Sequence, residues 1–151
     1  ESKEKYIPVI YCSAYGNTAK LAQTIAEGIK SVLPQCKLEI FDANEYPMKE
    51  LVYKVNNSDA FAIGSPTINR NAVGPIWQLV SSIDAINSKG RPCAVFGSFG
   101  WSGEAVPMLT SQLKAMKVNV FEDGYRCRFV PSEDDLKGAF EYGKRFAESF
   151  K

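Results

Sequence analysis

One segment of the chain has the composition of a phosphate site. Ser13-Ala14-Tyr15-Gly16-Asn17-Thr18 follows an apolar run and opens a stretch with helical periodicity. The N-terminus of a helix attracts anions because its first backbone N–H groups have no partner within the helix. Ser13, Asn17 and Thr18 add side-chain donors, and Gly16 lets a ligand approach the backbone closely. We therefore predict that residues 13–18 bind a phosphate, although this segment alone would equally fit an ordinary capped turn.

Two further segments have the composition of a site for a flat ring. Gly64-Ser65-Pro66-Thr67-Ile68-Asn69 and the segment 97–104 (GSFGWSGE) each follow a buried apolar run, and both are predicted to be loops. The polar stretch 68–71 is long enough to wrap the ribityl chain of a flavin. Phe99 and Trp101 are large aromatic residues among glycines, and exposed aromatics on a loop usually mark binding. Packing of Trp101 in the core is the less favoured alternative.

Together the three segments predict bound FMN. The first lacks the lysine of a Walker-type loop and the G-x-G-x-x-G of a dinucleotide site. We assign to the phosphate Ser13, Ala14, Tyr15, Gly16, Asn17 and Thr18. The ribityl chain and the ring edge are assigned to Ser65, Pro66, Thr67 and Asn69. The isoalloxazine ring is assigned to Gly97, Ser98, Phe99, Gly100, Trp101 and Gly103.

The elements that must position these segments alternate between strand and helix. Strands are expected at 6–12, 37–41, 60–63, 92–96, 118–121 and 126–130. Helices are expected at 18–33, 46–55, 74–86, 103–116 and 132–150, with Pro47 in the first turn of the second and Ser132 capping the last. Parallel strands need helical crossovers, so this order predicts an α/β fold with a doubly wound, five-stranded parallel sheet covered on both faces. The expected strand order is 2-1-3-4-5, the flavodoxin order, for which FMN at the β1/β3 switch point is a standard example.

Length, composition and charge indicate what class of protein this chain is. The chain has 151 residues, 45% of them hydrophobic, a net charge of +1 and no histidine. These values are typical of a single globular domain and give no indication of a nucleic-acid surface or a membrane span. The four cysteines, Cys12, Cys36, Cys93 and Cys127, include no C-x-x-C pair, so we expect free thiols, no metal site and a cytoplasmic protein. The chain begins at Glu1 rather than Met, and we expect it to have been excised from a longer polypeptide.

The same segments carry a resemblance to a known family. G-S-P-T-x-N, the run F-G-S-F-G-W-S-G-E-A-V and T-A-K-L-A-Q-T-I-A-E-G-I resemble the flavodoxin-like domain of flavodiiron proteins, also called A-type flavoproteins. The resemblance spans essentially the whole chain. Its most specific motif is F-G-S-x-G-W-S-G, since ordinary flavodoxins have a different ring loop. Tyr15 stands where an ordinary flavodoxin usually has a second threonine, and flavodiiron domains tolerate an aromatic residue there.

The resemblance implies a role in electron transfer. In that family FMN takes electrons from rubredoxin or a flavin reductase and passes them to a di-iron centre. The centre lies on a metallo-β-lactamase-like domain and reduces dioxygen or nitric oxide. That domain needs histidine ligands, which this chain lacks, so we expect the redox domain of an oxidoreductase that is catalytically incomplete alone.

Other functions remain open on the sequence. A free-standing flavodoxin carrier would need the same FMN site, and an NAD(P)H-quinone reductase of flavodoxin fold would oxidise NAD(P)H with quinone. A phosphorylation-switched receiver would need clustered acidic residues after the first strand, where this chain has Ser13-Ala14. A cofactor-free interaction module would leave the hydroxyl-rich and aromatic segments unexplained.

Overall fold

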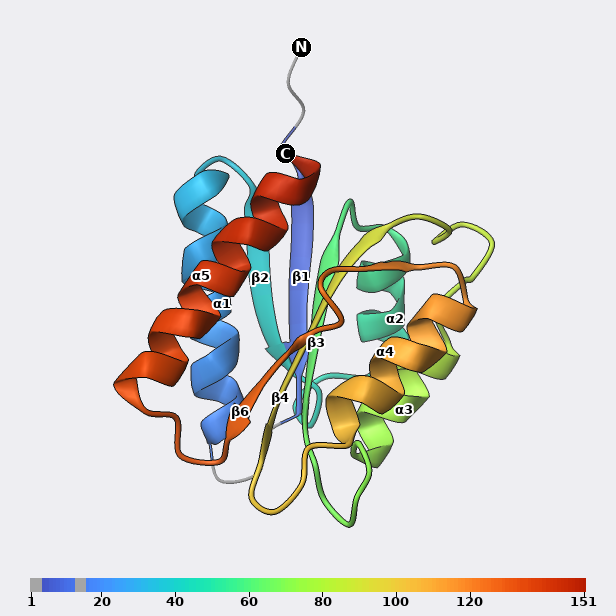
Figure 1. Ribbon diagram of the computed structural model, residues 1–151. Coiled ribbons are helices and arrows are strands. Elements are labelled where there is room, and N and C mark those ends of the chain that lie inside the picture. Colours follow the sequence, from blue (N-terminus) through green and yellow to red (C-terminus); the bar gives the residue numbers. More distant parts are fainter. Residues whose placement is uncertain (1–3, 13–15) are drawn as a thin grey trace.

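A computed structural model describes residues 4–12 and 16–151. The strands are β1 (Tyr6–Tyr11), β2 (Lys37–Asp42), β3 (Phe61–Pro66), β4 (Pro92–Phe99), β5 (Asn119–Val120) and β6 (Tyr125–Arg128). The helices are α1 (Asn17–Val32), α2 (Met48–Asn56), α3 (Gly74–Ser81), α4 (Ala105–Ala115) and α5 (Glu133–Phe150). The sheet forms a middle layer, with α1 and α5 on one face and α2, α3 and α4 on the other (Figure 1).

The strand order is β2-β1-β3-β4-β5, and every pairing is parallel. This confirms the predicted doubly wound flavodoxin order. The fifth position, however, is shared by two short strands, since β5 pairs with the start of β4 and β6 with its end. A turn between them holds Glu122, Asp123 and Gly124 at φ values of 54°, 60° and 91°, and this left-handed backbone interrupts the strand.

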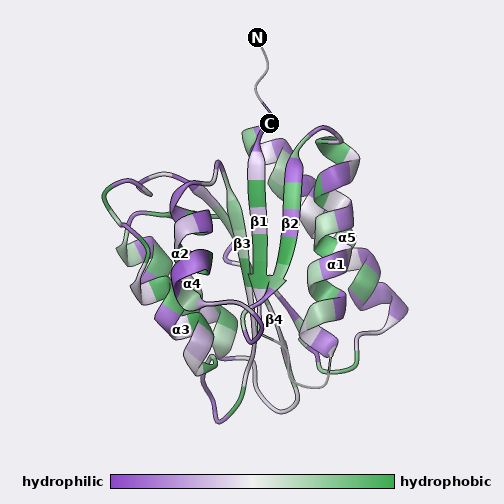
Figure 2. Ribbon diagram, turned by 180° about the vertical axis from the view of Figure 1, so that it is seen from behind, coloured by the Kyte–Doolittle hydropathy of each residue, from purple (hydrophilic) through white to green (hydrophobic). Residues whose placement is uncertain are grey.

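Each face of the sheet has its own core. Ile7 and Val9 of β1 point toward α1 and α5, where Tyr142 and Phe146 are fully or almost fully buried. Ile10, on the opposite face, packs in the core formed with α2, α3 and α4. This alternation follows from the two-residue period of a strand, and it explains why β1 is apolar along most of its length (Figure 2).

Several element ends differ from the sequence-based expectation. The segments 64–66 and 97–99 were expected to be loops, but they extend β3 and β4, because Ser65 pairs with Gly97 and Pro66 with Ser98. Helix α3 ends at Ser81 rather than residue 86, and the Asp84 side chain instead accepts the N–H groups of Ile86 and Asn87 in a turn.

The two predicted helix starts had different outcomes. Pro47 precedes α2 as its N-cap rather than lying in its first turn. The predicted cap of α5 is confirmed: Ser132 and Asp135 form a reciprocal capping box with two 3.0 Å hydrogen bonds. None of the helices in the described part of the chain is long and apolar enough to cross a membrane.

Candidate cofactor site

The three predicted segments meet at one edge of the sheet. β1, β3 and β4 are adjacent and parallel, so their carboxyl ends lie together, at the end of the sheet opposite the C-terminus (Figure 1). Thr18 Oγ1 and Ser98 Oγ form a buried hydrogen bond of 3.0 Å, which joins the start of α1 to the end of β4. Thr67 N donates to Ser98 O at 2.8 Å, which joins the second segment to the third. The structure therefore brings together segments that are up to 80 residues apart.

The start of α1 is open to an anion. Ser13, Ala14 and Tyr15 lie outside the described residues, and their assignment to the phosphate stays a prediction. Gly16 is the N-cap at φ 80°, a left-handed conformation that favours glycine. Glycine has no side chain to occupy the first N–H groups of the helix, and the first turn of α1 contains no acidic residue. Apart from its chain neighbours, no atom of the described residues lies within 4 Å of a Cβ built on Gly16.

The second segment is more compact than the sequence suggested. Residues 68–71 do not form an extended stretch that could wrap a ribityl chain. Instead Ile68 and Asn71 exchange backbone hydrogen bonds of 2.9 and 3.0 Å around Asn69 and Arg70, whose φ values are 54° and 60°. Asn69 is thus at the exposed tip of a tight turn, and its predicted contact would be made from that tip.

The hydroxyls of the second segment already have partners within the protein. Ser65 is buried, and its Oγ accepts the Val73 N–H at 3.1 Å and donates to Pro66 O at 2.8 Å. Thr67 Oγ1 accepts the Ala105 N–H at 3.0 Å and thereby caps the start of α4. Ser65 has already used its hydroxyl proton and would reach a ligand through the backbone, whereas the Thr67 hydroxyl only accepts and can still donate its proton to a ligand.

The third segment presents aromatic surface at the edge of the sheet. Phe99 ends β4 half-buried, and Gly100 is exposed. Trp101 is 92% exposed, which excludes the alternative that it packs in the core of this chain. A flat, exposed indole is suited to contact a planar ring.

Two arginines that the sequence analysis missed support this segment. Arg126 Nη1 donates to Gly103 O at 2.8 Å, and the Arg128 guanidinium lies 5.7 Å from the centre of the Phe99 ring. Both are on β6, which pairs with the end of β4. The alternation of exposed and buried residues in β6 could have indicated that they share a face, but not which segment they contact.

The described residues offer no sign of thiol or metal chemistry at this edge. Burial raises the pKa of Cys12, just after β1, although its Sγ accepts a 3.4 Å hydrogen bond from Asn44 Nδ2. The thiol is therefore protonated near neutral pH. Within residues 4–12 and 16–151, no three His, Cys, Asp or Glu side chains are arranged to hold a metal ion.

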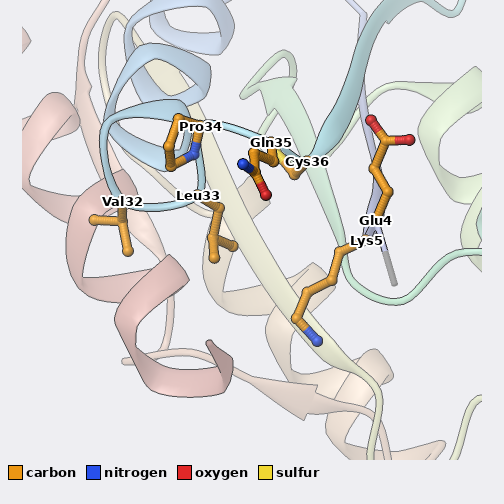
Figure 3. Close-up of a pocket in the computed structure, with 7 residues that line it drawn as sticks. All are labelled: Glu4, Lys5, Val32, Leu33, Pro34, Gln35 and Cys36. Atoms are coloured by element: carbon orange, nitrogen blue, oxygen red, sulfur yellow. The ribbon is translucent and has the colours of Figure 1, made fainter. Parts of the chain in front are cut away.

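A cavity of about 470 Å³ lies at the other end of the molecule. It is lined by residues just before β1, including Lys5, by the last residue of α1, Val32, and by residues between α1 and β2, including Leu33 (Figure 3). These are the amino ends of β1 and β2, so the cavity is separate from the edge where the three segments meet.

The chain matches known proteins over nearly its whole length. The flavodoxin family model matches residues 9–143. The flavo-diiron protein FprA2 of Clostridium acetobutylicum is 55% identical over 149 residues, covering 99% of this chain and 37% of that protein. The type A flavoprotein fprA of Rhodobacter capsulatus is 36% identical, covering 96% of this chain and 33% of that protein. The chain thus spans about a third of these relatives.

Solved structures of flavodiiron proteins and flavodoxins superpose on this chain. The Flv1 flavodiiron core from Synechocystis superposes with a TM-score of 0.86 at 36% identity, over 96% of this chain and 36% of that one. A flavodoxin from the domain Archaea superposes with a TM-score of 0.84 at 27% identity, over 95% of this chain and 97% of that one. The strand order and these matches together show that the chain belongs to the flavodoxin family, with flavodiiron and type A flavoproteins among its relatives.

Proposed function

We propose that this chain is the FMN domain of a flavodiiron-type protein and carries electrons to a di-iron centre on a separate domain. Its cofactor, as a member of the flavodoxin family, is FMN. The observation that carries the proposal is the alignment of nearly all of this chain with about a third of flavodiiron relatives. In this proposal residues 1–151 are a single flavodoxin-like domain of a larger protein.

The residues at the carboxyl edge have distinct parts in this proposal. The N–H groups at the start of α1, with Asn17, Thr18 and the segment 13–16, hold the phosphate. The turn at Asn69 and the backbone of 65–67 contact the ribityl chain and the ring edge. Residues 97–103 line the ring, with Phe99 and Trp101 shielding it from water. FMN supplies the redox chemistry by accepting and releasing electrons at this ring, and the protein binds, orients and covers it.

The partners in this proposal come from the resemblance to flavodiiron proteins, in which a metallo-β-lactamase-like domain holds the di-iron centre. The absence of histidine from this chain is consistent with iron ligands on a separate domain. The electron donor in this proposal is rubredoxin or a flavin reductase. We place the protein in the reducing cytoplasm, where its four buried cysteines stay free.

A free-standing flavodoxin carrier is the second candidate. It is favoured by the close superposition on an archaeal flavodoxin that this chain covers almost completely. Both candidates bind FMN and transfer electrons, and they differ in the acceptor.

The test is a reconstitution. The FMN-loaded chain is reduced anaerobically and mixed with a separately produced metallo-β-lactamase-like domain of a flavodiiron relative. We expect rapid flavin reoxidation only when that domain, loaded with iron, is present, together with consumption of dioxygen or nitric oxide. The chain alone should show neither stoichiometric iron nor fast nitric oxide turnover. Reoxidation no faster with the iron domain than without it would instead favour the free-standing carrier.

A further inference from the structure

A second cavity lies between α4 and the turn that separates β5 from β6. Its volume is about 460 Å³, and its polar lining consists of Thr110, Ser111, Lys114, Asp123 and Arg126. None of these residues belongs to the three segments of the cofactor site. The cavity is nevertheless linked to the ring segment, because Arg126 also donates to Gly103 O.

The hydroxyl of Thr110 is unpaired. Thr110 is only 5% exposed, and its Oγ1 has no hydrogen-bond partner among the described residues. Buried polar groups are nearly always paired, and an unpaired one is costly, so such a group calls for a ligand or an ordered water. A Cβ built on Gly124 would lie 3.6 Å from this oxygen, which places the turn directly over the hydroxyl.

The charges around this hydroxyl are suited to an anion. Lys114 forms an ion pair with Asp123, and both side chains are more than half exposed. The Arg126 guanidinium donates a hydrogen bond to the neutral carbonyl of Gly103. No carboxylate of the described residues lies within ion-pair distance of this guanidinium. The lining therefore carries one uncompensated positive charge beside two hydroxyl donors.

The Asp123 carboxylate is held on a strained backbone. Asp123 and its neighbour Glu122 adopt positive φ values, which are unfavourable for residues other than glycine. Glu122 is pinned to α5 by Arg145 with hydrogen bonds of 2.8 and 3.0 Å, while Asp123 is pinned to α4 by Lys114. The Lys114–Asp123 pair thus links the turn to α4 beside Thr110.

We propose that this cavity is a binding site for a small oxyanion, which displaces the Asp123 carboxylate from Lys114. The incoming oxygen atoms accept hydrogen bonds from Thr110 Oγ1, Ser111 Oγ, Lys114 and Arg126. The turn at 122–124 moves aside as the Lys114–Asp123 pair opens, which exposes the Thr110 hydroxyl. Asp123 is therefore an internal competitor of the ligand.

The test is a titration of the FMN-loaded chain with inorganic phosphate or with acetate, at constant ionic strength set by chloride. Backbone amide chemical shifts of Thr110, Ser111 and Gly124 are followed by NMR, and flavin fluorescence verifies that FMN stays bound. Saturable shifts at these three amides are expected, and the phosphate and acetate arms distinguish a phosphate ligand from a carboxylate ligand.

Two variants separate binding from structure. Asp123→Asn removes the competitor and should tighten binding at least fivefold, although it also removes an ion pair. Thr110→Val keeps the shape of the side chain and removes the unpaired hydroxyl. It should weaken anion binding roughly tenfold while leaving the ligand-free protein as stable as the wild type or more so. Thr24→Val is the control, since Thr24 is a half-buried helical threonine on α1, away from the cavity, whose hydroxyl donates to Lys20 O at 2.8 Å.

Other results would overturn the proposal. Shifts that do not saturate, or that are equal in wild type and Thr110→Val, would indicate general screening or a hydroxyl satisfied by water. Weaker binding in Asp123→Asn would show that the carboxylate is a structural partner of Lys114 and not the competitor of an anion.

Discussion

One buried hydroxyl pair joins two parts of the cofactor site. Thr18 Oγ1 and Ser98 Oγ have each other as partners, at 3.0 Å, between the start of α1 and the end of β4. Replacing one member leaves the other buried and without a side-chain partner among the described residues. We expect Thr18→Val to lower the free energy of unfolding by about 1–3 kcal/mol, measured by urea denaturation.

The double variant decides whether the pair is responsible. Thr18→Val with Ser98→Ala removes both hydroxyls, so it should be destabilised by less than the sum of the two single variants. Additive losses would contradict a direct interaction between these side chains.

The exposed indole of Trp101 is expected to contact the flavin ring. We predict that Trp101→Ala weakens FMN binding by roughly 0.5–1.5 kcal/mol beyond the area lost, as expected for aromatic contacts. Flavin fluorescence should rise because a neighbouring indole is an efficient quencher. Reduction should become easier, since better access of water lowers the cost of charge on the reduced ring.

The phosphate contribution provides the control for Trp101. The ratio of FMN to riboflavin affinity should be the same in wild type and Trp101→Ala, because the indole does not lie in the phosphate segment. Unchanged affinity, fluorescence and reduction potential would show that Trp101 does not contact the ring.

Helices α1 and α5 approach closely through glycine. A Cβ built on Gly143 would lie 2.3 Å from the carbonyl oxygen of Ile25, a backbone atom that cannot move without separating the helices. Gly143→Ala should therefore destabilise the protein by about 1–3 kcal/mol or more. Gly74→Ala is the control: no atom beyond its chain neighbours lies within 4 Å of a Cβ built there, so the change should cost less than Gly143→Ala, although Pro75 disfavours a Cβ on the residue before it. Equal stability of the two variants would refute this packing.

The free energy of unfolding of the protein should fall at alkaline pH. Burial raises the pKa of Cys127 on β6 from 9.0 to about 11 and raises the pKa values of Cys93 and Tyr142 as well. The folded state thus favours the protonated groups. The contribution of these protonated groups to the free energy of unfolding is fully present below pH 9, and it is lost as the pH rises from 9 toward 11.

Urea denaturation between pH 8 and pH 11 measures this effect. Cys127→Ala should show a smaller decrease than the wild type across that range, because one of the shifted groups is gone. Parallel curves for the two proteins would mean that Cys127 is not among the groups responsible.

The sequence indicated the elements better than their ends. Continuous apolar runs predicted the parallel strands, and Ser132 with Asp135 correctly indicated the start of α5. Glycine and proline in 64–66 and 97–99 suggested loops, but these residues pair with one another across β3 and β4. Pairing between distant segments depends on the tertiary fold, so the local composition of a segment cannot predict it. The same limit applies to Arg126, whose contact with Gly103 is set by the register of β6 on β4.

The cofactor site and the two cavities lie in different parts of the molecule. The cofactor edge lies at the carboxyl ends of β1, β3 and β4, as expected where strand order reverses in a doubly wound sheet. The proposed oxyanion site lies beside that edge on α4, and the cavity near Lys5 and Leu33 lies at the opposite end. The phosphate segment before α1 was predicted from residue types alone, and its open helix start fits an anion.

The discrimination between FMN and riboflavin tests the central claim most directly. Apoprotein is titrated with each ligand, and the quenching of flavin fluorescence gives the two dissociation constants. Hydrogen bonds from the helix N-terminus to a phosphate are charge-assisted and contribute on the order of 1.5–3 kcal/mol each. We therefore predict that FMN binds several powers of ten more tightly than riboflavin, with one FMN per chain. Equal affinity for the two ligands would contradict the assignment of a phosphate to the start of α1.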